Sequence, residues 1–242
     1  MARHFLTGAE LTAEEQLALV DRAIELKADR LSSRALEGKS VALIFDKPSM
    51  RTRVSFDVGI EELGGHAVPL LQGEVQMGHR ESPRDIALVL SRMVHAIGVR
   101  TGPDEPLEEL AAHASVPVIN MLSRDHHPCQ ALADLVTLRE RFGRLEGLKL
   151  AYFGDGNNMA RSLLVAGRIA GMSRKAMEHD RVVASLRQQI GVDPVRLQQL
   201  TAGGRVGVVA HAHPDVRVKR VRAVGRLLRR HPGRLRKREL GR

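Results

Sequence analysis

The sequence predicts an α/β fold in which helices cover both faces of a parallel sheet. Over residues 1–172, apolar runs of strand length alternate with amphipathic runs of helix length. This alternation is typical of parallel sheets, because a crossover helix must return the chain before the next parallel strand. An apolar fraction of 43% in 242 residues is enough for a buried core. Polar motifs follow several of the strands, where sheets of this kind bind ligands.

The elements follow one another in a regular order. An amphipathic helix is expected near residues 12–30, because Thr12 and Glu15 have the spacing of a capping box. Short apolar runs predict strands at 40–46, 66–71, 96–100, 116–121 and 148–153. The segments between them predict helices near 52–63, 83–95, 104–114, 128–142 and 157–171. Pro128 suits the first turn of its helix, where a missing N–H costs no hydrogen bond.

The composition changes beyond Met172. Residues 173–242 contain 18 Lys or Arg and 5 Asp or Glu, whereas residues 1–172 contain 20 and 23, so this tail accounts for the net charge of +10. All six aromatic residues lie before residue 173. The tail predicts a helix at 175–190, a short strand at 205–210, a basic helix at 218–230 and disorder over 231–242.

Several classes of protein are excluded by composition. The single cysteine, Cys129, cannot form an internal disulfide, which favours a cytoplasmic protein. No apolar run approaches the roughly 20 residues of a membrane span, and residues 1–8 lack the apolar core of a signal peptide. We therefore expect no membrane partner. Nucleic acid is not expected either, because the basic tail has no aromatic residue on which bases could stack.

The first motif is Ser49, Met50, Arg51, Thr52 and Arg53, at a turn between a strand and a helix. The first N–H groups of a helix lack intrahelical partners and attract anions. Arginine adds fork-shaped donors that suit phosphate oxygens. This pattern indicates an oxyanion site for a small phosphorylated substrate. The alternative is structural: an N-cap hydroxyl and solvated arginines.

Two further motifs fall at strand ends. His127 and Gln130 flank the start of the helix at 128–142, where an imidazole and an amide could polarise a carbonyl and orient an amide group. Arg100 closes an apolar strand at the same predicted edge of the sheet. In the alternative interpretation His127 only caps the helix, while Gln130 and Arg100 are solvated.

A fourth motif, the turn at residues 154–158, has two glycines and two asparagines but lacks the full dinucleotide-binding pattern. Together, the four motifs resemble the ornithine branch of the aspartate/ornithine carbamoyltransferase family in order and spacing. The flanking segments at 64–67, 76–82 and 89–93 are similar as well. The resemblance covers about residues 3–172.

The resemblance implies transfer of a carbamoyl group from carbamoyl phosphate to L-ornithine, which gives L-citrulline and phosphate, without a metal or organic cofactor. It implies that the carbamoyl phosphate is held by Ser49, Met50, Arg51, Thr52, Gln76, Arg100, His127 and Gln130. Arg51, Arg100 and His127 are the implied catalytic residues, and Asn158 is implied to contact ornithine. Met50 stands where the family often has Thr. The change is tolerated if this position contributes mainly its N–H, whereas a hydroxyl contact would be lost.

The resemblance also implies an assembly. The residue at the position of Gln76 reaches a neighbouring subunit's site in the family, so a homotrimer is expected; the alternative is an ordinary loop residue. The implied domains are a carbamoyl phosphate-binding α/β domain at 1–142, the start of an ornithine-binding domain at 143–172, and an atypical basic tail at 173–242. The second α/β domain would then be incomplete or aberrant.

Three interpretations of the tail remain open: a truncated or frame-shifted sequence, a replacement module that binds nucleic acid or an acidic surface, and a reduced second lobe of a working enzyme. Because the family's ornithine-closing motifs are not found, we expect severely reduced turnover. The alternative function is a non-catalytic carbamoyl phosphate-binding remnant or interaction protein. We also expect uncovered apolar surface on the helices at 131–136 and 163–165.

Overall fold

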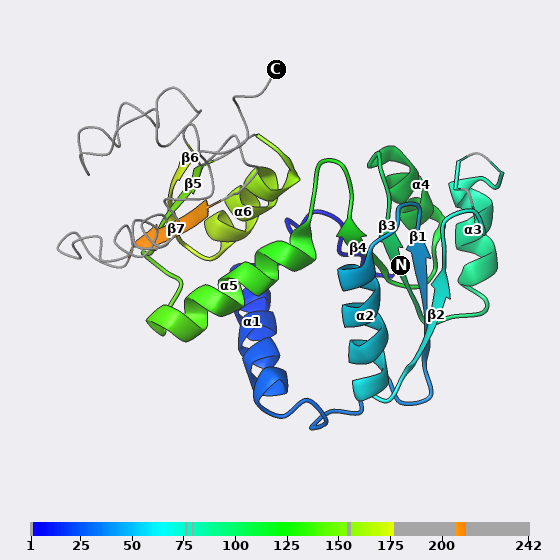
Figure 1. Cartoon of the computed structure of the whole chain (residues 1–242), viewed down its shortest axis with the longest axis horizontal. Helices are drawn as coiled ribbons and strands as arrows, with labels where there is room; N and C mark the ends of the chain where they lie inside the picture. Colours follow the sequence, from blue (N-terminus) through cyan, green and yellow to red (C-terminus); the bar gives the residue numbers. More distant parts are fainter. Residues whose placement is uncertain (1, 76, 79, 154–155, 177–206, 212–242) are drawn as a thin grey trace, which may run out of the picture. The chain divides into compact units, whose positions relative to one another are not determined.

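The computed structural model describes residues 2–75, 77–78, 80–153, 156–176 and 207–211. The chain divides into two compact units, Met1–Ala210 and His211–Arg242. The elements in chain order are α1 (Ala13–Ala28), β1 (Ser40–Phe45), α2 (Met50–Glu62), β2 (His66–Leu70), α3 (Pro83–Leu90), β3 (Ala96–Arg100), α4 (Glu105–His113), β4 (Val118–Leu122), α5 (Pro128–Phe142), β5 (Lys149–Phe153), α6 (Asn158–Ile169), β6 (Ser173–Ala176) and β7 (Gly207–His211) (Figure 1).

Two sheets are present in the described part of the chain. The first has the order β2-β1-β3-β4, and all of its neighbouring strands are parallel. The second has the order β6-β5-β7, with β5 and β6 parallel. In the first sheet the chain moves from β1 to one side and later to the other, so β1 and β3 flank a topological switch point. Ligands bind outside the carboxyl ends of strands at such a point.

Strand β1 shows how both faces of the first sheet are buried. Ala42 and Ile44 pack in a cluster with side chains of α3 and α4, whereas Val41, Leu43 and Phe45 pack in a cluster that includes Ile60 of α2. This alternation follows from the two-residue period of a strand. Figure 1 shows α2 beside the strands and α3 and α4 against the other face. The predicted parallel sheet with helices on both faces is therefore confirmed.

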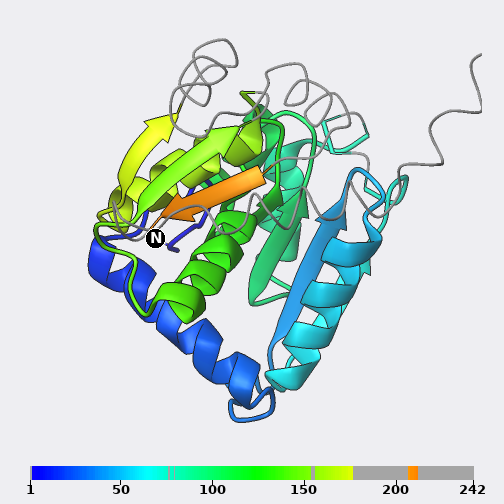
Figure 2. The same cartoon turned by 60° about the vertical axis from the view of Figure 1, so that its left-hand side comes forward.

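The helices α1, α5 and α6 pack together, which corrects one expectation. The side chain of Gln16 on α1 is 2% exposed and its Nε2 donates to the carbonyl oxygen of Ala166 on α6 over 3.0 Å. Ala131, Leu135 and Leu163 are nearly fully buried. The expected uncovered apolar surface is therefore wrong for these three residues, and α1 lies against α5, as both views show (Figures 1 and 2). Leu132, Val136, Leu164 and Val165 remain partly exposed.

The predicted elements of residues 1–172 are all present, with small differences at their ends. The capping box of Thr12 and Glu15 is formed. Helix α3 ends at Leu90 instead of 95, because tight turns follow in which the N–H of Met93 donates to Leu90. No helix in the described part of the chain is long and apolar enough to cross a membrane.

The predictions for the tail, residues 173–242, agree less well with the structure. The predicted helix at 175–190 begins inside strand β6, so it is wrong for residues 175–176, and the remaining residues lie outside the described part. The strand predicted at 205–210 is found as β7. The helix predicted at 218–230 and the disorder predicted over 231–242 also lie outside the described residues.

Candidate functional site

The switch point between β1 and β3 joins three of the residues predicted to bind the substrate. Ser49 follows β1, Thr52 lies in the first turn of α2, and Arg100 ends β3. Ser49 Oγ donates to Thr52 Oγ1 over 3.0 Å, and Arg100 Nη1 donates to the same oxygen over 3.0 Å. The hydroxyl of Thr52 therefore links the loop after β1 to the end of β3.

The N-termini of α2, α4 and α5 at this edge of the sheet have no side-chain cap. The N-cap residues of α2 and α5 are Ser49 and His127, and neither side chain accepts a hydrogen bond from its helix. In contrast, α1, α3 and α6 are capped by Thr12, Ser82 and Asn157. Uncapped first turns keep N–H donors free and carry partial positive charge, which favours an anion.

The imidazole of His127 is held neutral by its surroundings. Burial and, second, the positive charge of Arg100 lower the pKa of His127 from 6.5 to about 4. Its Nδ1 is buried and has no hydrogen-bond partner among the described residues. A neutral ring with a free nitrogen can donate to or accept from a ligand group at neutral pH.

Arg100 is also incompletely satisfied. Its Nε is buried without a partner in the described part of the chain, although Nη1 is bonded to Thr52. Burial lowers the pKa of its guanidinium below the ordinary value of an arginine. Buried donors that remain unpaired are costly, so this edge of the sheet is arranged to receive an acceptor from outside the chain.

The other predicted residues are placed less tightly. Met50 and Arg51 are exposed in the first turn of α2, and the Met50 side chain is 75% exposed. A depression of about 460 Å³ lies beside them and is lined by Phe45, Pro48, Ser49, Met50, Arg53, Val54, Leu71 and Gln72. The exposed Gln130 donates through Nε2 to Asp134 Oδ1 of its own helix over 3.2 Å. Gln76 and two residues of the turn at 154–158, Gly154 and Asp155, lie outside the described residues.

Asn158 begins α6 and contacts the loop at residues 123–127, which connects β4 to α5. Its Nδ2 donates to the carbonyl oxygen of Ser123 over 2.9 Å. The hydroxyl of Ser162, which is 1% exposed, accepts from the backbone N–H of His127 over 2.7 Å. The start of α6 therefore holds the loop that carries His127.

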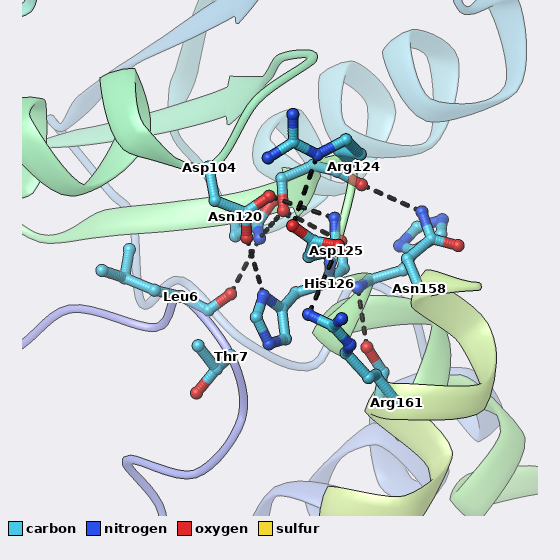
Figure 3. Close-up of polar contacts among 12 residues, drawn as sticks. Leu6, Thr7, Asp104, Asn120, Arg124, Asp125, His126, Asn158 and Arg161 are labelled. Carbon is cyan, nitrogen blue, oxygen red and sulfur yellow. Dashed lines mark hydrogen bonds and ion pairs between the residues drawn. The ribbon is translucent and has the colours of Figure 1, made fainter. Parts of the chain in front are cut away.

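Asp104 and His126 hold the same loop from its other side and were not predicted from the sequence (Figure 3). His126 Nδ1 lies 2.7 Å from Asp104 Oδ2, and the N–H of Asp125 donates to Asp104 Oδ1 over 3.0 Å. An aspartate before a helix reads in sequence as an N-cap, and nothing in the spacing of 22 residues connects it to His126.

The described residues contain no group of three or more His, Cys, Asp or Glu side chains placed to hold a metal ion. What they do provide is the open N-termini of α2 and α5, the guanidinium of Arg100 and the neutral ring of His127. Donors of this kind can bind an oxyanion and polarise a carbonyl oxygen beside it.

Comparison with known proteins agrees with this chemistry. Residues 3–140 match the family model "Aspartate/ornithine carbamoyltransferase, carbamoyl-P binding domain". The ornithine carbamoyltransferase of Parafrankia sp. (strain EAN1pec) is 57% identical over 175 residues, which are 71% of this chain and 55% of that protein. That of Renibacterium salmoninarum is 48% identical over 202 residues, which are 81% of this chain and 63% of that protein.

The solved structures give the same result. The ornithine carbamoyltransferase from Pyrococcus furiosus superposes with a TM-score of 0.68 at 44% identity, over 72% of this chain and 57% of that one. The chain thus spans little more than half the length of several proteins it matches. The match to the Renibacterium protein covers more of the chain than residues 3–172, the extent of the resemblance seen in the sequence.

Proposed function

This chain belongs to the aspartate/ornithine carbamoyltransferase family, and on that basis we propose that it transfers the carbamoyl group of carbamoyl phosphate to L-ornithine, giving L-citrulline and phosphate. The observation that carries this proposal is the bond between Arg100 and Thr52 beside the uncapped N-terminus of α2. The guanidinium of Arg100 and the free N–H groups of α2 support binding of a phosphate with an adjacent carbonyl.

In this proposal each residue has a distinct role. Ser49, Thr52, Arg51 and the N–H of Met50 hold the phosphate, and Arg100 and His127 polarise the carbamoyl oxygen. The positive charge of Arg100 and the low pKa of His127 support the second role. At neutral pH the guanidinium stays charged and the imidazole stays neutral. Gln130 binds the carbamoyl amide, which requires its side chain to leave Asp134.

Three further assignments belong to the same proposal. Asn158 contacts ornithine, and Gln76 completes the site of a neighbouring subunit in a homotrimer. The carbamoyl phosphate-binding domain ends near residue 142, where Gly143 ends α5 with a positive φ of 71°, and residues 143–172 begin the ornithine-binding domain. We also place the protein in the cytoplasm.

The test is a citrulline assay on the purified full chain with carbamoyl phosphate and ornithine. Arg51→Ala should abolish turnover, because it removes a guanidinium from the mouth of α2. Arg34→Ala is the matched control, since Arg34 is an exposed arginine paired with Glu37 away from this edge. Equal rates in both variants would contradict the proposal.

A binding measurement separates two outcomes if no citrulline forms. Calorimetry with carbamoyl phosphate should show binding by the wild type and its loss in Arg51→Ala. Binding without turnover would leave the phosphate half of the proposal standing and reject catalysis by this chain. Absence of both would reject the proposed site.

A further inference from the structure

The ring of His127 has few restraints of its own. Its Nδ1 is buried without a partner among the described residues. The bonds of this residue are made by its backbone: the N–H donates to Ser162 Oγ, and the carbonyl oxygen accepts from the N–H of Ala131. The direction of the ring therefore depends on the path of the loop at 123–127. Small displacements of a catalytic group can cost much of its effect.

Asp104 is placed unusually for a residue that begins a helix. It is the N-cap of α4, yet its side chain makes no capping bond. Both carboxylate oxygens instead point across to the loop, one to the N–H of Asp125 and the other to the ring of His126. Asp104 therefore forgoes a stabilising capping bond for these two contacts.

The contact between Asp104 and His126 is shielded from water. The side chains are 13% and 21% exposed. Burial would raise the pKa of Asp104, but the bonds from His126 and from the N–H of Asp125 outweigh it, so this pKa is lowered. An ionised carboxylate only accepts hydrogen bonds, so the Nδ1 of His126 carries the hydrogen.

Hydrogen bonds within the loop connect the restrained residues to one another. Ser123 Oγ donates to the carbonyl oxygen of His126, and Asn120 Nδ2 donates to Ser123 Oγ. The loop is thus fixed at its start by Asn120, at its middle by Asp104 and at its end by Ser162. Figure 3 shows Asp104, Asp125 and His126 close together, with Asn158 and Arg161 approaching from α6.

We propose that Asp104 and His126 form a positioning pair that fixes the loop at 123–127 and thereby directs the ring of His127 toward Arg100. Neither residue touches substrate in this role. The importance of this pair for turnover rests on the function proposed above. Its effect on the orientation of His127 in the free protein is independent of that function.

Two substitutions at His126 test the pair without changing the charge of Asp104. His126→Asn keeps a donor close to the position of Nδ1, whereas His126→Leu removes it. We expect the first to preserve the His127 ring signals in histidine ¹H–¹⁵N spectra of the full chain, and the second to shift them. His127→Gln assigns these signals by their loss.

Asp104→Asn tests the carboxylate, because it keeps the shape and removes the acceptor for His126. It should shift the same His127 signals. Glu108→Gln removes a charge from the exposed first turn of the same helix and should leave them unchanged. If Asp104→Asn does not fold, the two His126 variants still decide the question.

The affinity for carbamoyl phosphate tests whether the pair matters for ligand binding. His126→Leu should weaken it roughly tenfold, and His126→Asn should leave it near the wild-type value. Variants that lose thermal stability while the His127 signals stay in place would overturn the positioning role. If the wild-type chain binds no carbamoyl phosphate, the proposed function fails, but the spectra still confirm or reject the pair.

Discussion

A single oxygen atom, Thr52 Oγ1, joins the parts of the candidate site at the residue scale. It accepts from Ser49 Oγ and from Arg100 Nη1. We expect Thr52→Val to leave both donors unpaired, which should cost about 1 kcal/mol of unfolding free energy. Carbamoyl phosphate affinity, measured by calorimetry, should fall about tenfold because Arg100 is no longer held in place. Thr52→Ser keeps the oxygen and should behave as wild type, so equal losses in both variants would contradict this role.

The low pKa of His127 has a consequence for acid stability. The unfolded chain protonates this ring near pH 6.5 and the folded chain only near pH 4, so the unfolded state binds more protons between these values. The unfolding free energy should therefore fall as the pH drops from 6.5 to 4, by at most about 3 kcal/mol from this residue. Urea unfolding across this range should show that loss in wild type and a smaller one in His127→Gln; parallel curves would argue against a buried neutral ring.

The residues of the candidate site differ in how far the sequence could place them. Ser49, Thr52 and Arg100 were predicted at one edge of the sheet, because strands of a parallel sheet end together. Their shared hydrogen bonds could not be predicted, since these depend on which strands are neighbours. Asp104 and His126 were missed for the same reason: the contact joins the loops after β3 and β4, and no periodic pattern records it.

At the element scale, the centre of the sheet depends on a close approach at Gly98 in β3. A Cβ there would lie 2.9 Å from Leu43 Cδ2 and 3.0 Å from Met121 Sδ. We expect Gly98→Ala to lower the unfolding free energy by about 1–3 kcal/mol, because these buried side chains must move.

Gly59 in the interior of α2 is the matched control. A Cβ at Gly59 would meet no other atom of the described residues within 4 Å. Gly59→Ala should raise the unfolding free energy by about 0.5–1 kcal/mol, because alanine favours a helix more than glycine does. Denaturant titrations of both variants measure the two changes in unfolding free energy. Changes of the same sign would show that the space around the added Cβ does not determine the effect.

The elements themselves were largely predictable over residues 1–172. Strand β1 is a continuous apolar run because both of its faces are buried, and such runs are typical of parallel sheets. The predicted end of α3 is too late, because the apolar residues after Leu90 continue the helical pattern while the backbone turns. The prediction for residues 175–176 is wrong because pairing with β5, which is distant in sequence, fixes them as strand β6.

At the scale of the whole molecule, Gln16 joins segments 150 residues apart. Gln16→Ala removes the bond to Ala166 and leaves space beside it, which should cost about 1–3 kcal/mol. Hydrogen exchange should increase in α6 while the β1–β4 sheet stays protected. Glu14→Ala changes an exposed residue of the same helix and should have no such effect; faster exchange throughout the chain would mean that Gln16 supports the fold as a whole.

The open N-termini of α2 and α5 have a consequence for the choice of buffer. A ligand that binds only the folded state adds RT ln(1 + [L]/Kd) to its stability, about 2.7 kcal/mol at a concentration one hundred times Kd. The melting temperature should therefore be higher in phosphate than in chloride at equal ionic strength, and Arg51→Ala should reduce that difference. An unchanged melting temperature would mean that these termini do not collect anions. If the difference is found, the melting temperature of the protein reports the concentration of free phosphate, because it rises as more phosphate binds the folded state.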